Sequence, residues 1–433
     1  MDIMWNASRP LVATALVVGA TFAGGGAELS QEAPDDRSHG ERPTDAPATP
    51  CPDLEERLAG VDAVLARRPE DATLPFYKAL FQARCGLAAA AGATLPDVAR
   101  FGDGFLPVRD FGFDPVWEDE GFQTARERMA AALPEVVAAE IAFEVEGRDL
   151  IPEGIAFDAS SGALYIGSMN RNEILKVTPD GEQRRVADSE EGLGQVLGLA
   201  IDPGRRQLLA VDIGPLVEDP ADRRTGAVVA IDLDSGEVAR RLEAYGALQL
   251  NDVTAASDGT IYATDSAGGT LWHAAENASS LERWLPEVVI PGVNGLAVSA
   301  DGEALYVAHS TGVARIDRGT GEVLPRIAND TRETLGAIDG LYARGRRLYG
   351  IQNVTNPGRV IAIELDETGT RAVEVTTLLS HHHPALDEPT TGTVAGDRLL
   401  VLANSHVARL EPDGSLRDEA TIRAPVILSV PLP

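Results

Sequence analysis

The stretch "GVNGLAVSADGEALYVAHS", residues 292–310, reads as two short β-strands joined by a turn. One apolar run ends at Val298 and the next begins at Leu305, and the intervening Ala300–Glu303 segment has turn composition. The first strand opens on Asn294, at a place where an apolar residue is usual. The recurrence of this unit along the chain decides the fold.

Five other segments repeat the pattern. They are "PEGIAFDASSGALYIGS" from residue 152, "VLGLAIDPGRRQLLAVD" from 196, "LNDVTAASDGTIYATDS" from 250, "IDGLYARGRRLYGIQN" from 338 and "PTTGTVAGDRLLVLANS" from 389. The second positions of successive units are 43 to 54 residues apart. Six such strand–turn–strand units are typical of a β-propeller with one four-stranded sheet per blade. We therefore predict a mainly β protein with a six-bladed β-propeller over residues 138–433.

The second positions of the six units carry the functional signal. They are Glu153, Leu197, Asn251, Asn294, Asp339 and Thr390. The first strand of each blade lines the central channel, so these side chains are expected to form one ring at one mouth of that channel. A single Asn or Asp is more often a strand-end cap, but four oxygen-bearing side chains at one register favour a shared cation, because burying them without a partner is costly.

The residue types in this ring indicate which cation it would hold. The predicted ligands, Glu153, Asn251, Asn294 and Asp339, offer only oxygen. Oxygen ligands suit a hard cation, and a loose ring drawn from different blades suits the flexible coordination of Ca²⁺ better than the tight octahedron of Mg²⁺. We predict a site for Ca²⁺ or another divalent cation.

In their order and spacing, the motifs "PEG", "LND", "VNGL" and "IDGL" resemble the senescence-marker-protein/gluconolactonase (regucalcin-like) family of six-bladed propellers. The layout is also similar to that of the paraoxonases and diisopropyl fluorophosphatase. The resemblance covers about residues 140–433 and implies a divalent-metal-dependent hydrolase of lactones or related esters. It implies that Glu153, Asn294 and Asp339 bind the metal, that Asn251 contacts metal or substrate, and that Asp339 also acts as a base.

One position departs from the family pattern. Sugar-lactonase members commonly carry an arginine two residues before the first Asn, where this chain has Gln249. A neutral amide cannot make the charged bidentate contact of a guanidinium, so a less polar lactone or ester fits as well as a gluconate-like substrate. We predict substrate contacts from Gln249, Asn251 and Thr390, and catalytic roles for Asp339, Asn251 and His309. A structural role for His309 is an equal alternative.

Two other functional classes stay open. The propeller is a versatile platform, so the chain is alternatively a non-catalytic binding module whose calcium braces the channel. A non-hydrolytic enzyme similar to strictosidine synthase is the other alternative. Nucleophilic serine catalysis is not supported, since the sequence contains no G-x-S-x-G elbow.

The N-terminus carries a compartment signal. Arg9 precedes an apolar run over 11–23 and small residues at 24–27, which predicts a signal peptide over residues 1–27. The run is shorter than the ~18 residues that span a bilayer, so we expect export to the periplasm or medium and no stable membrane span after processing. A retained anchor is the alternative. Residues 28–50 are polar and Pro-rich and read as a disordered linker.

Residues 51–137 change to helical periodicity, with Leu54, Leu58 and Val61 on one face. We predict a small α-helical cap domain, loosely tetratricopeptide-like, which packs on the propeller or contacts another protein. The two cysteines of the chain, Cys51 and Cys85, lie in this region. A disulfide between them is reasonable in an oxidising compartment, and two separate buried thiols are the alternative.

The charge of the chain limits its partners. Lys and Arg number 37 and Asp and Glu number 67, which gives a net charge of −30. Such a chain repels nucleic acid and anionic lipid surfaces. A small-molecule substrate is therefore the expected partner, and a nucleic-acid role is excluded.

Overall fold

The structure is a computed structural model that describes residues 51, 53–67, 73–99, 105–109, 112–216, 225–286, 289–353, 358–411 and 413–433. The predicted signal peptide and linker lie outside the described residues. Among the residues described, no helix is both long and apolar enough to cross a membrane.

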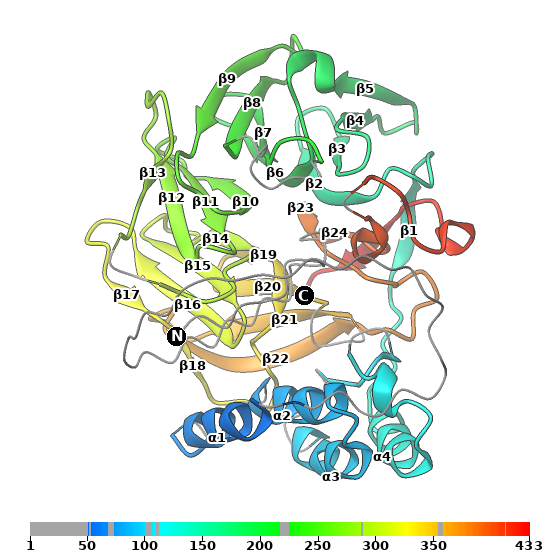
Figure 1. Cartoon of the computed structure of the whole chain (residues 1–433). Coiled ribbons are helices and arrows are strands. Elements are labelled where there is room, and N and C mark those ends of the chain that lie inside the picture. The colour runs from blue at the N-terminus through cyan, green and yellow to red at the C-terminus, as the bar shows by residue number, and fades with distance from the viewer. Residues whose placement is uncertain are drawn as a thin grey trace, which may run out of the picture.

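Six β-sheets stand in a ring around a central axis (Figure 1), which confirms the predicted six-bladed propeller. The strands of each blade are given from the channel outward. The first blade contains β2 (Pro152–Asp158), β3 (Ala163–Ser168), β4 (Ile174–Val177) and β5 (Gln183–Ala187), and the second contains β6 (Val196–Asp202), β7 (Gln207–Asp212), β8 (Ala227–Asp232) and β9 (Val238–Glu243). The third contains β10 (Leu250–Ala255), β11 (Ile261–Asp265), β12 (Thr270–Ala274) and β13 (Glu282–Arg283), and the fourth contains β14 (Leu296–Val298), β15 (Ala304–His309), β16 (Gly312–Asp317) and β17 (Val323–Leu324).

The last two blades depart from this simple order. The fifth contains β19 (Ile338–Arg344), β20 (Arg347–Gln352), β21 (Arg359–Leu365) and β22 (Arg371–Leu379), and β18 (Ala328–Asn329) adds a short parallel edge. The sixth contains β23 (Gly392–Ala395), β24 (Arg398–Leu402), β25 (Val426–Pro431) and, outermost, β1 (Glu140–Glu144). Because β1 pairs antiparallel with β25, the two ends of the propeller segment close the ring in one sheet.

The apolar core lies between neighbouring blades. Where the sixth blade meets the first, Leu402 and Ile427 pack in one cluster with Leu150 and Ile166. The other blade junctions have similar clusters. Strands covered on both faces read as continuous apolar runs, and β3 is accordingly buried along its whole length.

The predicted α-helical region precedes the propeller, and its described residues form four α-helices: α1 (Leu54–Leu65), α2 (Thr73–Arg84), α3 (Ala88–Ala99) and α4 (Glu120–Ala130). They have a core of their own, built around Phe76, Leu95, Phe113 and Phe122. A disulfide joins Cys51, before α1, to Cys85, directly after α2. Whether the unit is related to tetratricopeptide repeats stays a prediction.

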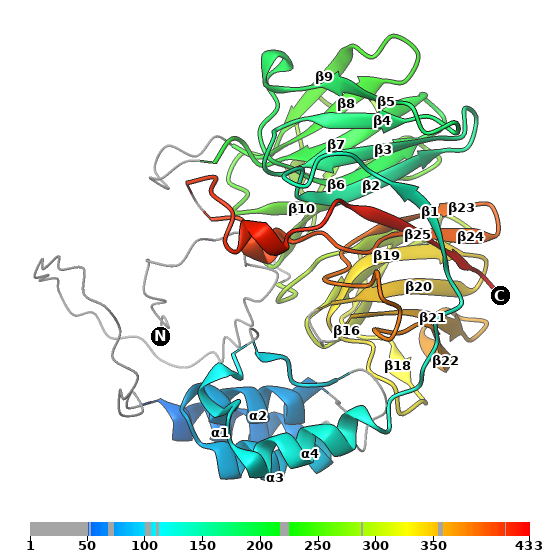
Figure 2. The same ribbon diagram turned by 90° about the vertical axis from the view of Figure 1, so that its right-hand side faces the viewer.

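The helical unit lies beside the fifth blade, next to β18 and β22 (Figures 1 and 2). Its connection to β1 is fixed to the loop after β22, since the Ser380 amide donates to the Val136 carbonyl at 2.8 Å and the Val136 amide donates to Ser380 Oγ at 3.0 Å. At the start of α2, Thr73 lies so close to Gly336 that a Cβ there would come within 2.8 Å of Thr73 Oγ1. The helices therefore pack against loops that precede the inner strands of the last two blades.

Candidate metal and substrate site

A local irregularity places the ring residues at the channel mouth. The pairing of inner strand with second strand is interrupted in four blades, between Pro152 and Ile155 in the first and between Ile338 and Leu341 in the fifth. The same interruption occurs after Val196 and Leu250. In each of these blades two consecutive residues of the inner strand have no partner in the second strand, and the ring residue is the first of the two. Its side chain therefore need not follow the regular alternation of the strand. β-Bulges re-aim side chains in this way beside active sites.

At the residue after the ring position, the backbone of the next inner strand lies too close to leave room for a side chain. A Cβ on Gly154 would lie 2.1 Å from the Leu197 carbonyl oxygen, and one on Gly295 would lie 2.3 Å from that of Asp339. The Gly295 amide donates to the Asp339 carbonyl at 2.7 Å. Glycine at these positions lets adjacent inner strands approach, which brings their ring residues together.

The chain enters several inner strands in a left-handed conformation. Two residues before the ring position, φ is +43° at Ile151, +68° at Gly292, +58° at Ala337 and +59° at Glu388. This conformation costs a residue with a Cβ roughly 1–2 kcal/mol. Backbone strain of this kind clusters at functional sites, where the surrounding structure holds it in place.

This strain gives a first prediction. Ala337→Gly is expected to stabilise the protein by about 1 kcal/mol, because glycine adopts positive φ without steric cost. Ala343→Gly, in the regular part of β19, serves as the control and is expected to destabilise by about 0.5–1 kcal/mol. Denaturant midpoints of the two variants measure the difference, and equal shifts in the same direction would contradict a strained entry at Ala337.

The ring contains buried oxygen atoms that lack partners. Asp339 is only 2% exposed, and Glu153 and Asn294 are also buried. Glu153 Oε2, Asn294 Oδ1 and Asp339 Oδ1 have no hydrogen-bond partner within the described part of the chain. The other Asp339 oxygen, Oδ2, accepts a hydrogen bond from the Asn353 side chain. Because unpaired buried polar atoms are costly, these three oxygens are poised for a ligand.

Negative charge is concentrated at the same place. Burial raises the pKa of Glu153 well above its ordinary value, and the fields of Asp339 and Asp252 raise it further. Burial likewise raises the pKa of Asp339 to about 7, against the stabilising hydrogen bond from Asn353. Burial raises the pKa of Asp252 to about 7. Carboxyls that interact so strongly without a countercharge are costly to ionise.

These residues fit a hard divalent cation. The unpartnered atoms are carboxylate and amide oxygens, which are the donors such cations take. The charges of Glu153 and Asp339 would balance a divalent ion. Across the ranges that the structure describes, no group of three or more His, Cys, Asp and Glu side chains forms a metal cluster. The candidate set therefore depends on amide oxygens as well as carboxylates.

Asp252 was missed by the sequence reasoning. It follows Asn251 on β10, at the position that holds glycine in four other units, and its side chain is buried. Its Oδ1 accepts from the Val253 amide at 2.8 Å, and a Cβ on Gly198 would lie 2.3 Å from that oxygen. The sequence did contain a signal for Asp252. The second and third positions read "ND" in this unit, where four other units read "EG", "LG", "NG" or "DG".

The other side chains that were predicted to contact substrate or to act in catalysis differ in their burial and hydrogen bonds. Thr390 Oγ1 donates to the Glu153 carbonyl at 3.1 Å, which ties the sixth blade to the first. Asn251 is buried on β10, and Gln249 is half-buried with its Oε1 unpartnered among the described residues. His309 Nε2 lies 3.0 Å from the Pro325 carbonyl, and its Nδ1 accepts from the Thr311 amide at 3.3 Å. A proton-transfer role for His309 would require exchange of these bonds.

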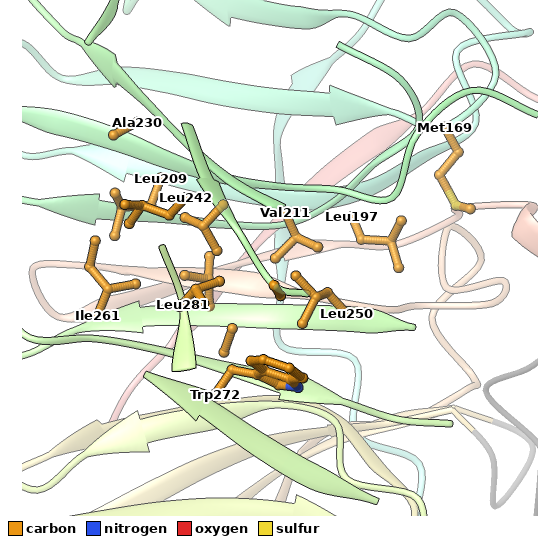
Figure 3. Packing of buried hydrophobic residues seen from close by; sticks show 14 of the residues in the cluster. Met169, Leu197, Leu209, Val211, Ala230, Leu242, Leu250, Ile261, Trp272 and Leu281 are labelled. Atoms are coloured by element: carbon orange, nitrogen blue, oxygen red, sulfur yellow. The ribbon is translucent and has the colours of Figure 1, made fainter. Parts of the chain in front are cut away.

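The ring position without a ligand, Leu197, is packed in an apolar cluster beside Val211 and Leu250 (Figure 3). Leu410 and Ile422 join this cluster from the connection between β24 and β25. Arg148 Nε donates to the Ile422 carbonyl at 2.6 Å and holds that connection in place. The ring position at Leu197 therefore takes part in apolar packing and offers no ligand atom.

The raised pKa values predict how the metal-free protein responds to pH. A carboxyl whose pKa is higher in the folded state binds its proton more tightly there, so folding is favoured at low pH and loses stability as pH rises toward about 7. We expect the thermal midpoint of chelator-treated protein to be about 5 °C lower at pH 8 than at pH 5.5. Glu153→Gln removes one of these groups and should flatten the dependence. An unchanged slope in that variant would contradict the assignment.

Comparisons with known proteins place this site in a family context. The family model described as SMP-30/Gluconolactonase/LRE-like region matches residues 151–378, which include the four predicted ligands. Similar solved structures include a gluconolactonase from Xanthomonas campestris, 17% identical over 68% of this chain and 88% of that chain, with a TM-score of 0.45. The calcium-binding protein regucalcin from Agrobacterium tumefaciens is 17% identical over 69% and 95%, with a TM-score of 0.47. An aldose sugar dehydrogenase from Streptomyces coelicolor is 14% identical over 69% and 98%, with a TM-score of 0.47. No curated protein matches the chain.

Proposed function

The chain belongs to the SMP-30/gluconolactonase/LRE-like family, and we propose that it is a divalent-metal-dependent hydrolase of lactones or related esters, with calcium as the expected metal. One observation carries this proposal. Glu153, Asn294 and Asp339 all lie in the family-matched segment, and each has a buried side-chain oxygen that lacks a partner in the described residues. Family membership favours a lactone or ester as the substrate.

Each residue has a role that its position supports. Glu153 and Asp339 would hold the cation through charge, and Asn251 and Asn294 through amide oxygens. When bound, such an ion polarises a substrate oxygen and lowers the pKa of water. In the metal-free protein, burial raises the pKa of Asp339 to about 7. A bound cation would lower that pKa, so Asp339 would be ionised at neutral pH and suited to accept a proton. The Asn353 amide orients that carboxyl through Oδ2.

Substrate contacts follow from the same geometry. Gln249 directly precedes β10, Asn251 is the second residue of that strand, and Thr390 lies two residues before β23 of the sixth blade. Gln249 offers a neutral amide where a guanidinium would select for charged or hydroxyl-rich substrates. We therefore place a weakly polar acyl group, and not a sugar acid, at this side of the ring.

We propose further that the protein works outside the cytoplasm. The Cys51–Cys85 disulfide supports this proposal, because disulfides persist mainly in oxidising compartments. Fractionation of the native host checks it: the mature chain is expected in the periplasm or medium, beginning near residue 28. Protein that begins at Met1 in the cytosol would contradict it.

A panel of aryl esters and lactones tests the hydrolase proposal. The purified full chain is assayed with calcium, with other divalent cations and with chelator. Turnover that disappears with chelator and returns with metal is the expected result. Calcium binding without turnover of any substrate would support a binding module whose ion braces the channel, and turnover unaffected by chelator would contradict metal dependence.

A further inference from the structure

The most exposed large apolar side chains of the described residues lie on two neighbouring loops. Tyr245 is 72% exposed, Leu248 is 66% exposed and Val289 is 61% exposed. Tyr245 and Leu248 belong to the connection from β9 to β10, and Val289 belongs to the connection from β13 to β14. Single exposed apolar residues are common, but a group of them in one place marks a binding surface.

Both loops are fixed to the same corner of the third blade. The Leu248 and Gln249 amides each donate to the Asp265 carboxylate at 2.9 Å. The Gly268 amide donates to Asp265 Oδ1 at 2.8 Å, and the Ile290 amide donates to the Gly269 carbonyl at 2.7 Å. Hydrogen bonds to the Asp265 carboxylate and to the Gly269 carbonyl therefore fix both loops to the end of β11 and the turn that follows it.

The apolar rim, defined as Tyr245, Leu248 and Val289, lies on the two connections that lead to the ring positions Asn251 and Asn294. Asn251 is the second residue of β10, and Asn294 lies two residues before β14. Leu248 is adjacent to Gln249 and three residues before Asn251, and Val289 is five residues before Asn294. A substrate whose reacting carbonyl lies at the ring would extend over these loops if it carried a side chain.

We propose that the substrate of this site carries an unbranched apolar chain that lies on the apolar rim while its lactone or ester group reaches the ring. This inference rests on the proposed function and names the class of substrate. Both parts of such a substrate would meet side chains of matching polarity. The neutral Gln249 makes no charged contact with the acyl group, and the rim gains free energy by covering apolar area.

A series of lactones tests the inference with the full-length protein and calcium. γ-Butyrolactone is compared with its homologues that carry progressively longer unbranched side chains, and glucono-δ-lactone is the polar comparator. Each methylene that is buried on the rim is expected to raise kcat/KM about three- to fourfold. The ratio of kcat/KM between the longest and the shortest lactone is the quantity reported.

Two variants and a matched control locate the effect. Leu248→Ser and Val289→Ser are expected to lower this ratio by about tenfold each, because a polar side chain replaces the apolar contact. Val373→Ser makes the same substitution at a valine that is 46% exposed on β22, away from the inner strands. It is expected to leave the ratio unchanged.

Binding of the corresponding γ-lactams, which are not hydrolysed, separates this inference from the proposed function. If no lactone is turned over but lactam affinity rises with chain length and falls in Leu248→Ser, the hydrolase proposal fails and the apolar chain stands. Turnover that does not depend on chain length, or a ratio that Leu248→Ser leaves intact, overturns the inference. The inference is also overturned if the protein binds lipid vesicles, Leu248→Ser abolishes that binding, and kcat/KM does not depend on chain length. The apolar rim would then be a membrane-binding surface. If lactam affinity is flat and no lactone is turned over, both proposals fail.

Discussion

Asp339→Asn is expected to reduce kcat/KM for lactone hydrolysis by about a thousandfold, within the range that loss of a general base produces. The substitution keeps the size of the side chain and removes its charge. It therefore removes the proposed proton acceptor and one of the two carboxylates that would balance the cation. Initial rates at saturating calcium measure the effect.

Asp301→Asn makes the same change at the opposite end of a blade, in the exposed turn between β14 and β15. An asparagine there can still accept hydrogen bonds from the Glu303 amide and the Ser299 hydroxyl, which Asp301 Oδ1 accepts at 3.1 and 2.6 Å. This control should keep kcat/KM within about twofold. Equal activities of the two variants would remove Asp339 from the mechanism.

The Cys51→Ser, Cys85→Ser double variant is expected to destabilise the first two helices by about 3–4 kcal/mol, the entropic contribution of a disulfide that closes a loop of this length. The helix α1 depends on this bond because Val61 is its only buried residue. The ion pair between Lys78 and Asp62, 2.8 Å apart at the surface, adds little.

Native-state hydrogen exchange measures this effect by region, which matters because the chain has two packed units and a single unfolding midpoint would mix them. Amides in α1 and α2 should exchange a few hundredfold faster in the double variant, the factor that this free energy corresponds to. Amides in β3 and β7 provide the internal control and should be unchanged. Unaltered protection of α1 would show that packing alone holds it.

The blade count was accessible from sequence, because six units repeat one strand–turn–strand pattern, and five of the six carry a polar residue at the second position. That regularity comes from the fold itself, since every inner strand meets the same neighbours. The assignment of Glu153, Asn251, Asn294 and Asp339 as ligands stays a prediction. The family was identified from the same residues, and the family model confirms it. Local periodicity also predicted a helical region before the propeller.

Features that depend on long-range contact were not accessible. The strand β1 closes the sixth blade by pairing Glu140 with Ser429, which no local pattern indicates. The field of Asp252 on Glu153 arises only when the first and third blades face one channel. The apolar cluster that Leu197 shares with Leu410 and Ile422 likewise joins residues that are far apart in the sequence.

Calorimetric titration of the metal-free full chain with calcium tests the central claim most directly. We expect one bound ion per chain, and an affinity at least about a hundredfold lower in Asp339→Ala, because a charged ligand is lost. Asn294→Ala should lose less, since water can replace a neutral amide oxygen. Leu197→Ala, at the ring position without a ligand, should bind calcium as the wild type does. If Asp339→Ala binds calcium as tightly as the wild type, Glu153, Asn251, Asn294 and Asp339 do not form one metal site.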